Sequence, residues 1–193
     1  MFDNLLMKTE IEAKIQISQS QLEQLKSKLI ELNAVKRYDR LEYNIFFDKN
    51  LLHKNKNELL RLRECRYPDG RTEFLVTFKR KDPIQDKFLK RQIEIEFNVS
   101  DGNTFALMMQ QLGYKEKFSF EKKRSSYSFM DNCLVEIDEI PKLGFFCEIE
   151  GPSKKVIEKA IASLGFTNAK FISKGYASLI CKMLEKKKFN LRF

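Results

Sequence analysis

Pairs of carboxylates recur at alternate positions in this sequence. They are Glu10 with Glu12 in EIEAKI, Glu94 with Glu96 in IEIEF, Glu136 with Asp138 in LVEIDEI, and Glu148 with Glu150 in CEIEG. Large apolar residues separate most of the partners, so in a β-strand both carboxylates of a pair would lie on one face. Carboxylate oxygens are the ligands that Mg²⁺ or Mn²⁺ prefers. The pattern is typical of a divalent-metal site, provided that the strands converge.

Basic residues follow the same alternation on other segments. They are Lys14 in EIEAKI, Arg61 and Arg63 in ELLRLRE, Lys79 in FLVTFK, and Lys122 and Arg124 in EKKRSSY. Arginine forks onto phosphate oxygens and lysine acts as a point charge, so these strands suit a polyphosphate. The sequence has no Walker-type glycine-rich loop, and a P-loop mechanism is therefore unsupported.

The segments that must position these residues are mostly short strands. Strands are predicted over 8–17, 41–48, 58–66, 72–81, 90–99, 116–130, 132–140 and 145–151, with turn residues between them. Helices are predicted over 18–34, 101–112 and 153–164 and from about Ser173. A capping box from Ser20 to Glu23 would begin the first helix. The pattern indicates one α+β domain over residues 1–193, with a flexible Lys-rich tail from about residue 185.

The central question is which way the charged faces point. A half-buried antiparallel sheet normally turns its polar face to water, and for any single strand that is the simpler interpretation. The whole set argues otherwise, because acidic pairs and basic pairs lie on different strands, whereas a solubility surface mixes the two signs. A closed barrel can enclose a polar interior while helices cover its apolar outside. We therefore predict that the charges point inward.

Composition narrows the class of protein. The chain is 42% hydrophobic and 33% charged, which is typical of a globular protein. No apolar run approaches the roughly 20 residues of a membrane helix, so no membrane partner is expected. Four scattered cysteines form no CxxC pair, and we expect free thiols and a cytoplasmic protein. The net charge of +9 suits an anionic partner, but without a base-stacking platform nucleic acid is disfavoured.

Taken in order, ExExK, LRLRE, TFK, KKRSSY, VEIDEI and LGFFCEIEG resemble the CYTH, or triphosphate tunnel metalloenzyme, superfamily from residue 8 to about 180. The resemblance implies a closed eight-stranded antiparallel β-barrel, a tunnel with a charged interior that helices cover. The implied metal ligands are Glu10, Glu12, Glu148 and Glu150. The implied phosphate ligands are Lys14, Arg61, Arg63, Lys79, Lys122, Arg124 and Lys174. Asp138 would support the metal or the activated water, so Asp138 and Lys14 are the expected catalytic residues.

One strand leaves a choice between two basic residues. In KRQIEIE, parity with Glu94 turns Lys90 inward, whereas a β-bulge would turn Arg91 inward. The family usually has an arginine there, so Arg91 is predicted as a further phosphate ligand. The class IV cyclase signature begins with a His-Phe pair upstream of ExExK, where this chain has NLLMKT. The single histidine, His53, is expected on a surface loop.

The resemblance implies an enzyme that uses Mg²⁺ or Mn²⁺ on a small triphosphate-containing substrate. We expect a triphosphatase that hydrolyses inorganic triphosphate, thiamine triphosphate or a nucleoside triphosphate. The alternative is a class IV adenylate cyclase that converts ATP to cyclic AMP and pyrophosphate. A non-catalytic polyphosphate-binding module is the third hypothesis. A homodimer is the oligomeric state that the family suggests, although no residue displays an interface.

Overall fold

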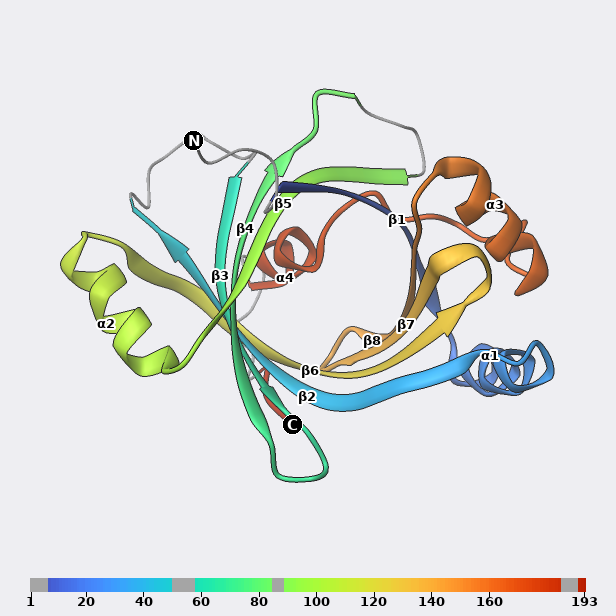
Figure 1. The fold of residues 1–193 in the computed structure, drawn as a ribbon, viewed down its shortest axis with the longest axis horizontal. Coiled ribbons are helices and arrows are strands. Elements are labelled where there is room, and N and C mark those ends of the chain that lie inside the picture. The colour runs from blue at the N-terminus through green and yellow to red at the C-terminus, as the bar shows by residue number, and fades with distance from the viewer. Residues whose placement is uncertain (1–6, 50–57, 85–88, 185–190) are drawn as a thin grey trace.

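The fold is a closed barrel of eight antiparallel strands surrounded by helices (Figure 1). The computed structural model describes residues 7–49, 58–84, 89–184 and 191–193. The strands are β1 (Met7–Ile17), β2 (Val35–Asp48), β3 (Glu58–Arg66), β4 (Thr72–Lys81), β5 (Leu89–Val99), β6 (Lys115–Phe129), β7 (Cys133–Ile140) and β8 (Gly144–Glu150). Around the barrel their order is β1-β5-β4-β3-β2-β6-β7-β8. The predicted α+β fold with an eight-stranded barrel is confirmed.

Helices cover the apolar outer face of the barrel. α1 (Gln19–Glu31) and α3 (Lys154–Ser163) pack on the outward residues of β1, β7 and β8, and α2 (Gly102–Gln111) packs on β3 and β4. Ile11, Ala13 and Ile15 of β1 are buried in the first of these clusters. Because neighbouring residues of a strand point to opposite sides, Glu10, Glu12 and Lys14 must then point into the barrel. A 3₁₀ turn (Met130–Asn132) joins β6 to β7.

The N-cap of α1 lies two residues before the predicted one. Ser18, not Ser20, is the N-cap, and its hydroxyl accepts from the Gln21 backbone while the Gln21 side chain accepts from the Ser18 backbone. An N-cap residue needs extended backbone angles, and Ser18 has them at the end of β1, whereas Ser20 is already helical. The predicted Ser20–Glu23 capping box is therefore wrong. The strand and helix themselves are confirmed.

One end of the barrel bore is apolar. Phe46, Phe120 and Phe146 share the alternation of the charged inward residues, and Tyr176 and Ile180 of α4 (Tyr176–Leu184) pack on them. Figure 1 shows α4 within the outline of the barrel, not on its outer wall. The C-terminal helix therefore closes off part of the bore, and the charged residues occupy the remainder.

The last three residues are docked along β6. The Glu121 backbone N–H donates to the Leu191 carbonyl at 2.8 Å, and the Phe193 N–H donates to Glu121 Oε2 at 2.9 Å. Leu191 is buried in the same cluster as α4. The prediction of a flexible tail is therefore wrong for residues 191–193, because a buried apolar side chain and two backbone contacts fix them. Residues 185–190 of the tail, and His53, lie outside the described residues.

Two further sequence expectations concern membrane-spanning helices and disulfide bonds. Within the described ranges no helix has both the length and the apolar character needed to span a bilayer. All four cysteines are free, and Cys65, Cys133 and Cys147 are buried.

Candidate active site

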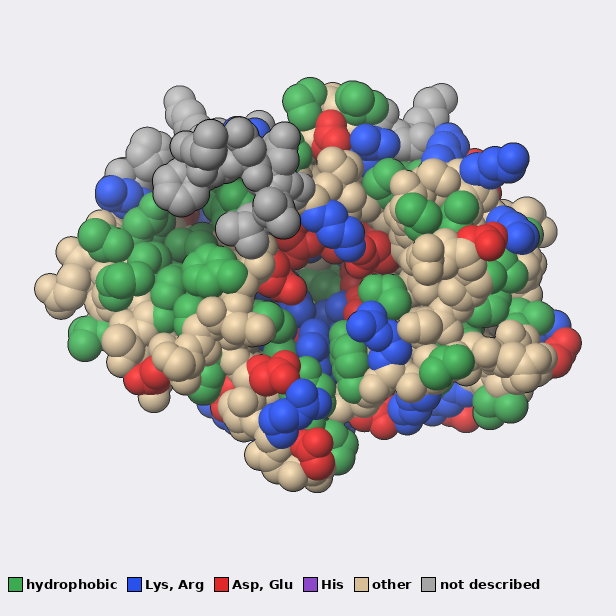
Figure 2. Space-filling view, viewed as in Figure 1, with side chains coloured by type: hydrophobic (Ala, Val, Ile, Leu, Met, Phe, Trp, Pro, Cys, Tyr) green, Lys and Arg blue, Asp and Glu red, His purple; other side chains and the backbone are tan. Residues whose placement is uncertain are grey.

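The bore contains a cavity of about 620 Å³ that side chains from all eight strands and the start of α4 line. Its basic lining residues are Lys8, Arg37, Arg40, Arg61, Arg63, Lys79, Lys90, Lys122 and Arg124. Its acidic lining residues are Glu10, Glu12, Glu58, Glu94, Glu96, Glu136, Glu148 and Glu150. Figure 2 shows the hollow, with acidic side chains gathered on one part of its rim and basic side chains deeper on the other side. The charged faces of the strands thus point inward, not into bulk water.

The four predicted metal ligands lie side by side. β1 pairs with β8, which places Glu12 opposite Glu150 and puts Glu148 opposite Lys14. Each carboxylate is held by a cation: Glu10 by Lys79 at 2.5 Å, Glu12 by Lys90 at 3.1 Å, Glu148 by Lys14 at 2.8 Å, and Glu150 by Lys8 at 2.6 Å. The described residues contain no group of three or more metal-type ligands already converged on one point. Binding a cation would therefore require these ion pairs to rearrange.

Two of these carboxylates, Glu10 and Glu148, stay ionised inside the protein. Burial alone would raise the pKa of Glu10, but Lys79 and Lys90 outweigh burial and lower the pKa to about 2. Burial also opposes ionisation of Glu148, and Lys14 and Arg124 again hold its pKa well below the usual range. A deprotonated carboxylate is the form that binds a cation, so the lysines keep this face of the bore ready for one.

The oxygen donors fit a hard divalent cation. The carboxylates of β1 and β8 supply only oxygen ligands, as Mg²⁺ and Mn²⁺ require. Gln92 stands opposite Glu10 in the β1–β5 pairing and lines the same cavity. Its buried Oε1 has no hydrogen-bond partner in the described part of the chain, which is the expected state of an oxygen that serves a ligand.

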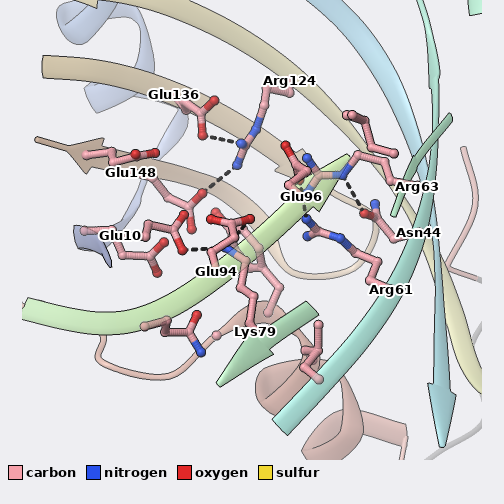
Figure 3. A pocket seen from close by; sticks show the side chains of 18 of the residues that line it. Glu10, Asn44, Arg61, Arg63, Lys79, Glu94, Glu96, Arg124, Glu136 and Glu148 are labelled. Carbon is pink, nitrogen blue, oxygen red and sulfur yellow. Dashed lines mark hydrogen bonds and ion pairs between the residues drawn. The ribbon is translucent and has the colours of Figure 1, made fainter. Parts of the chain in front are cut away.

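Buried basic residues from β3, β4 and β6 adjoin these carboxylates, and two of them, Lys79 and Arg124, contact Glu10 and Glu148 directly. Arg61 and Arg63 come from β3, Lys79 from β4 and Arg124 from β6 (Figure 3). Lys122 also lies on β6. Arg61 donates to Thr77 Oγ1 at 2.9 Å and lies 3.6 Å from Glu96. Its buried Nε has no partner among the described residues. This unpaired N–H is available to donate a hydrogen bond to an anion in the bore.

The pKa of Arg61 also reflects the excess of positive charge around this side chain. Burial lowers it first, and the neighbouring Arg63 cation lowers it further, to about 10. Burial and the neighbouring Arg124 likewise lower the pKa of Lys122, although Asp138 and Glu42 partly compensate. Negative charge placed between these cations would relieve their repulsion. The basic side of the bore is therefore arranged for an anion with several charges.

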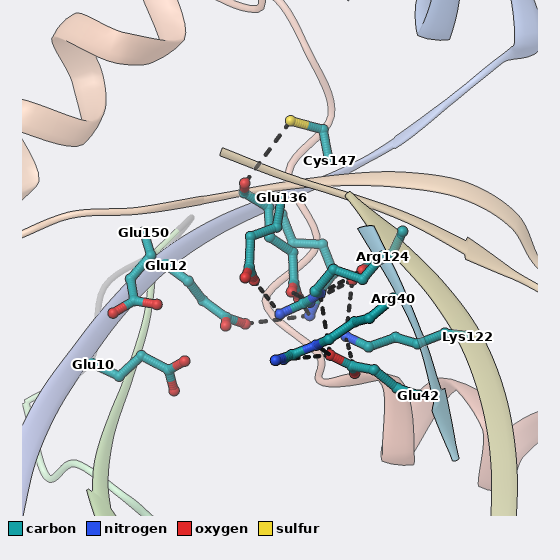
Figure 4. Close-up of polar contacts among 12 residues, drawn as sticks. Glu10, Glu12, Arg40, Glu42, Lys122, Arg124, Glu136, Cys147 and Glu150 are labelled. Atoms are coloured by element: carbon teal, nitrogen blue, oxygen red, sulfur yellow. Dashed lines mark hydrogen bonds and ion pairs between the residues drawn. The ribbon is translucent and has the colours of Figure 1, made fainter. Parts of the chain in front are cut away.

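Two fully buried carboxylates, Glu42 (Figure 4) and Asp138, do not line the cavity and contact its basic residues. Glu42 contacts Arg40 at 2.6 Å, Arg63 at 3.1 Å and Lys122 at 3.3 Å. Asp138, a predicted catalytic residue, contacts both Arg124 nitrogens Nε and NH2 at 2.6 Å and Lys122 at 3.1 Å. These contacts fix where the cations point, so Glu42 and Asp138 orient the basic side of the bore.

Lys14, the other predicted catalytic residue, is also buried beneath the cavity surface. Its side chain is 1% exposed and its Nζ lies 3.2 Å from Glu12, 2.8 Å from Glu148 and 4.2 Å from the ring centre of Tyr176. Burial would lower its pKa, but the two carboxylates outweigh burial and raise it. Lys14 thus remains a cation that joins the carboxylate side of the bore to α4.

Besides Lys14, two predicted phosphate ligands do not line the cavity. Arg91 stands opposite the outward residue Ile11 and contacts Asp82 at 3.4 Å, whereas Lys90 lines the cavity. β5 keeps a continuous register with β1, so no bulge turns Arg91 inward, and the inward placement predicted for it is wrong. The Lys174 side chain is exposed and does not line the cavity. Its backbone carbonyl accepts a hydrogen bond from Lys14 at 3.4 Å.

Several inward residues of β2 and β7 were not predicted from the sequence. β2 begins at Val35, earlier than residue 41, and this start brings Arg37, Tyr38 and Arg40 to the cavity. The alternation Tyr38, Arg40, Glu42, Asn44 was the available signal. Glu136 was recognised as sharing a face with Asp138 but was not assigned to the site. Burial raises the pKa of Glu136 to about 7, although Arg124 opposes the rise.

Comparisons with known proteins match this geometry. The chain is similar to the structure of PH1819 from Pyrococcus horikoshii OT3, with 26% identity and a TM-score of 0.75 over 92% of this chain and 99% of that one. It is also similar to a Vibrio parahaemolyticus protein described as a candidate adenylate cyclase (16%, TM-score 0.72, 93% and 99% covered). A third is HpAC1 from Hippeastrum, for which a dominant triphosphatase activity is described (16%, TM-score 0.67, 93% and 97% covered). At 16% identity the last two show a shared fold alone.

No protein with a curated description matches this sequence. The CYTH domain model matches residues 8–167, which contain all eight strands and the inward charged residues. This chain therefore belongs to the CYTH domain family.

Proposed function

We propose that this protein is a metal-dependent triphosphatase. The observation that carries the proposal is one 620 Å³ cavity that is lined both by the carboxylates of β1 and β8 and by buried cations of β3, β4 and β6. A triphosphate carries several negative charges along an extended chain, and Arg61, Arg63 and Arg124 all line this cavity, where guanidinium groups can bind phosphate oxygens. CYTH proteins are metal-dependent, and the carboxylates of β1 and β8 suit that requirement. Mg²⁺ and Mn²⁺ are equally compatible with an all-oxygen site.

In this proposal each side of the bore has a distinct task. Arg61, Arg63 and Lys79 bind phosphate oxygens and hold the chain in line, which removes much of the entropic barrier to attack. Arg124 and Lys122 stabilise charge that develops on the phosphoryl oxygens, and Glu42 and Asp138 keep those two cations in position. Glu10, Glu12, Glu148 and Glu150 would hold the divalent cation, which when bound neutralises phosphate charge and activates water.

Hydrolysis and cyclisation would use the same bore. In hydrolysis water attacks the terminal phosphorus, whereas in cyclisation the ribose 3′ hydroxyl attacks the α-phosphorus of ATP and pyrophosphate leaves. Triphosphatase is our first choice because the residues that we place around the phosphates require only a triphosphate chain. The adenylate cyclase alternative draws on the description of the Vibrio parahaemolyticus relative.

The products of three substrates test this proposal. Purified protein is incubated with Mg²⁺ or Mn²⁺ and, separately, with inorganic triphosphate, thiamine triphosphate and ATP. We expect phosphate release from at least one substrate and none without metal. Cyclic AMP as the main product of ATP would replace hydrolysis with cyclisation. Tight triphosphate binding with no turnover of any substrate would identify a binding module instead.

A matched pair of arginine variants tests the placement of the anion. Arg61→Ala removes a buried guanidinium with an unpaired Nε, whereas Arg91→Ala removes one on the outer side of the barrel. Loss of charged hydrogen bonds costs about 1.5–3 kcal/mol, so Arg61→Ala should weaken triphosphate binding about 10- to 100-fold by calorimetry. Arg91→Ala should leave the affinity within about twofold. Equal affinities for the two variants would contradict this placement.

A further inference from the structure

Aromatic rings and guanidinium groups form a cluster where the first part of β2 meets the β3–β4 turn. Its members are Tyr38, Arg40, Tyr67 and Arg71. A phosphate chain could bind in the bore without this cluster. Tyr38 and Tyr67 meet edge to face, with ring centres 6.1 Å apart and planes at 82°. The Arg40 guanidinium lies 4.4 Å from the centre of the Tyr38 ring, and it donates to the Tyr67 hydroxyl at 3.2 Å. Arg71 lies 4.0 Å from the centre of the Tyr67 ring. These contacts fix both rings before any ligand arrives.

The cluster borders the cavity next to its carboxylate side. Arg37, Tyr38 and Arg40 are lining residues of the bore. The Tyr38 hydroxyl donates to Glu136 at 3.4 Å, and Glu136 stands opposite Glu148 in the β7–β8 pairing. A group bonded to the end of a phosphate chain in the bore could therefore reach the Tyr38 ring.

Among the described cations in and beside this cluster, only one has no ion pair, and that cation is exposed, so solvent weakens its attraction for a phosphate chain. Glu42 neutralises Arg40 at 2.6 Å. Arg37 is exposed, forms no ion pair within the described ranges, and lies 6.0 Å from the centre of the Tyr38 ring. A half-buried ring with an exposed guanidinium near it is a surface for a flat, electron-rich partner. Inorganic triphosphate has no such part, but a heteroaromatic base does.

We propose that Tyr38 and Arg37 form a subsite for the planar heteroaromatic group of an organic triphosphate, which would make such a compound the preferred substrate. The inference rests on the proposed function, because it assumes that the phosphate chain lies in the bore. The base stacks on the Tyr38 ring, the Arg37 guanidinium closes over it, and Tyr67 and Arg40 hold Tyr38 in place. Tyr38 thus determines specificity and takes no part in the reaction itself.

Substrate selectivity of Tyr38→Leu tests the subsite. The ratio kcat/KM is measured for inorganic triphosphate, ATP and thiamine triphosphate. Loss of one base–aromatic stack should lower kcat/KM for the preferred organic substrate about 5- to 100-fold, mainly through KM, and leave the value for inorganic triphosphate within about twofold. Tyr38→Phe keeps the ring and should stay within about threefold of wild type for all substrates.

Two further variants keep the test decisive. Tyr43→Leu changes a tyrosine of the same strand that does not line the cavity and whose hydroxyl bonds to Ser119 at 3.0 Å, so selectivity should not change. Arg37→Gln alters an exposed residue and should fold even if Tyr38→Leu does not. It should lower the ratio of organic to inorganic kcat/KM by about threefold or more, since stacking of a guanidinium is lost.

Several outcomes would overturn the inference. Equal losses on organic and inorganic substrates in Tyr38→Leu would show that the ring acts on the bore as a whole. A Tyr38→Phe loss as large as that of Tyr38→Leu would assign the effect to the hydroxyl. A wild type that prefers inorganic triphosphate over both organic compounds would leave the proposed triphosphatase function intact and refute the subsite alone. A wild type that neither binds nor hydrolyses any triphosphate would refute the proposed function.

Discussion

Glu42 is the best single residue with which to test how the basic side of the bore is held together. Its side chain is fully buried, and its carboxylate contacts Arg40 at 2.6 Å, Arg63 at 3.1 Å and Lys122 at 3.3 Å. Burial opposes its ionisation, but Arg63 and Lys122 outweigh burial and hold the pKa of Glu42 well below its usual range. Glu42→Gln preserves the shape of the side chain and removes the negative charge from the centre of the cations.

The expected cost follows from the cations that this change leaves behind. Asp138 still neutralises Lys122, but Arg40 and Arg63 keep only the neutral partners Tyr67 and Asn44 from among these contacts. Removing one partner of a buried ion pair costs about 3–5 kcal/mol, because an unpaired charge stays buried. A native protein is stable by only about 5–15 kcal/mol, so Glu42→Gln should remove a large share of that stability.

The effect depends on pH with a definite sign. Because the pKa of Glu42 is lower in the folded protein than the roughly 4.3 of an unfolded glutamate, its contribution is fully present above about pH 4.3. The contribution is lost as the pH falls through the folded pKa. The difference in the free energy of unfolding between wild type and Glu42→Gln should therefore be constant near pH 7 and should shrink below about pH 4.

Urea unfolding measures this difference. With a slope near 2 kcal/mol/M, a loss of about 4 kcal/mol lowers the midpoint by about 2 M. Glu139→Gln is the matched control, since Glu139 is 39% exposed and lies 3.6 Å from the exposed Lys123. It should cost less than about 1 kcal/mol. If Glu42→Gln cost no more than Glu139→Gln at pH 7, the reasoning from buried charge would be refuted.

Two further predictions concern the ends of the chain elements. Ser18→Ala should destabilise the protein by about 1 kcal/mol in urea unfolding, since it removes the hydroxyl that accepts from the Gln21 backbone. Ser20→Ala should cost less than half as much, and the reverse order would contradict the observed cap. Leu191→Asp places a charge in the apolar cluster that holds α4, where Leu191 is 5% exposed. It should lower the thermal midpoint by several degrees, because burial of an unpaired charge costs a few kcal/mol, whereas Arg192→Asp should have a much smaller effect. Equal midpoints for the Leu191 and Arg192 variants would mean that the docked end does not support α4.

The sequence predicted the wall of the bore well because strand periodicity is local. EIEAKI alternates strictly, so Glu10, Glu12 and Lys14 had to share a side whatever the fold. The same rule paired Arg61 with Arg63 and Glu148 with Glu150. The rule was not extended to the start of β2, because the residues between Val35 and Arg40 alternate without the apolar partners that usually mark a strand, although Tyr38 and Arg40 continue the alternation of Glu42 and Asn44. Arg37, Tyr38 and Arg40 were missed for that reason.

The choice between Lys90 and Arg91 shows where local rules end. Both are basic neighbours in one strand, and only the register against β1 decides which of them points inward. The family usually has an arginine at this position, which favoured Arg91. The continuous pairing of β5 with β1 instead turns Lys90 toward Glu12.

The sequence alone determined which side chains share a face of each strand, and with the family resemblance it determined the closed barrel. Only the tertiary structure decided which charged residues reach the cavity surface and which lie behind it. Asp138 and Glu136 share a face of β7, but Asp138 is sealed under Arg124 while Glu136 lines the bore. The physical reason is that a strand's period of two fixes relative orientation, whereas depth in a closed barrel depends on partners far apart in sequence, such as Lys14 and Glu148.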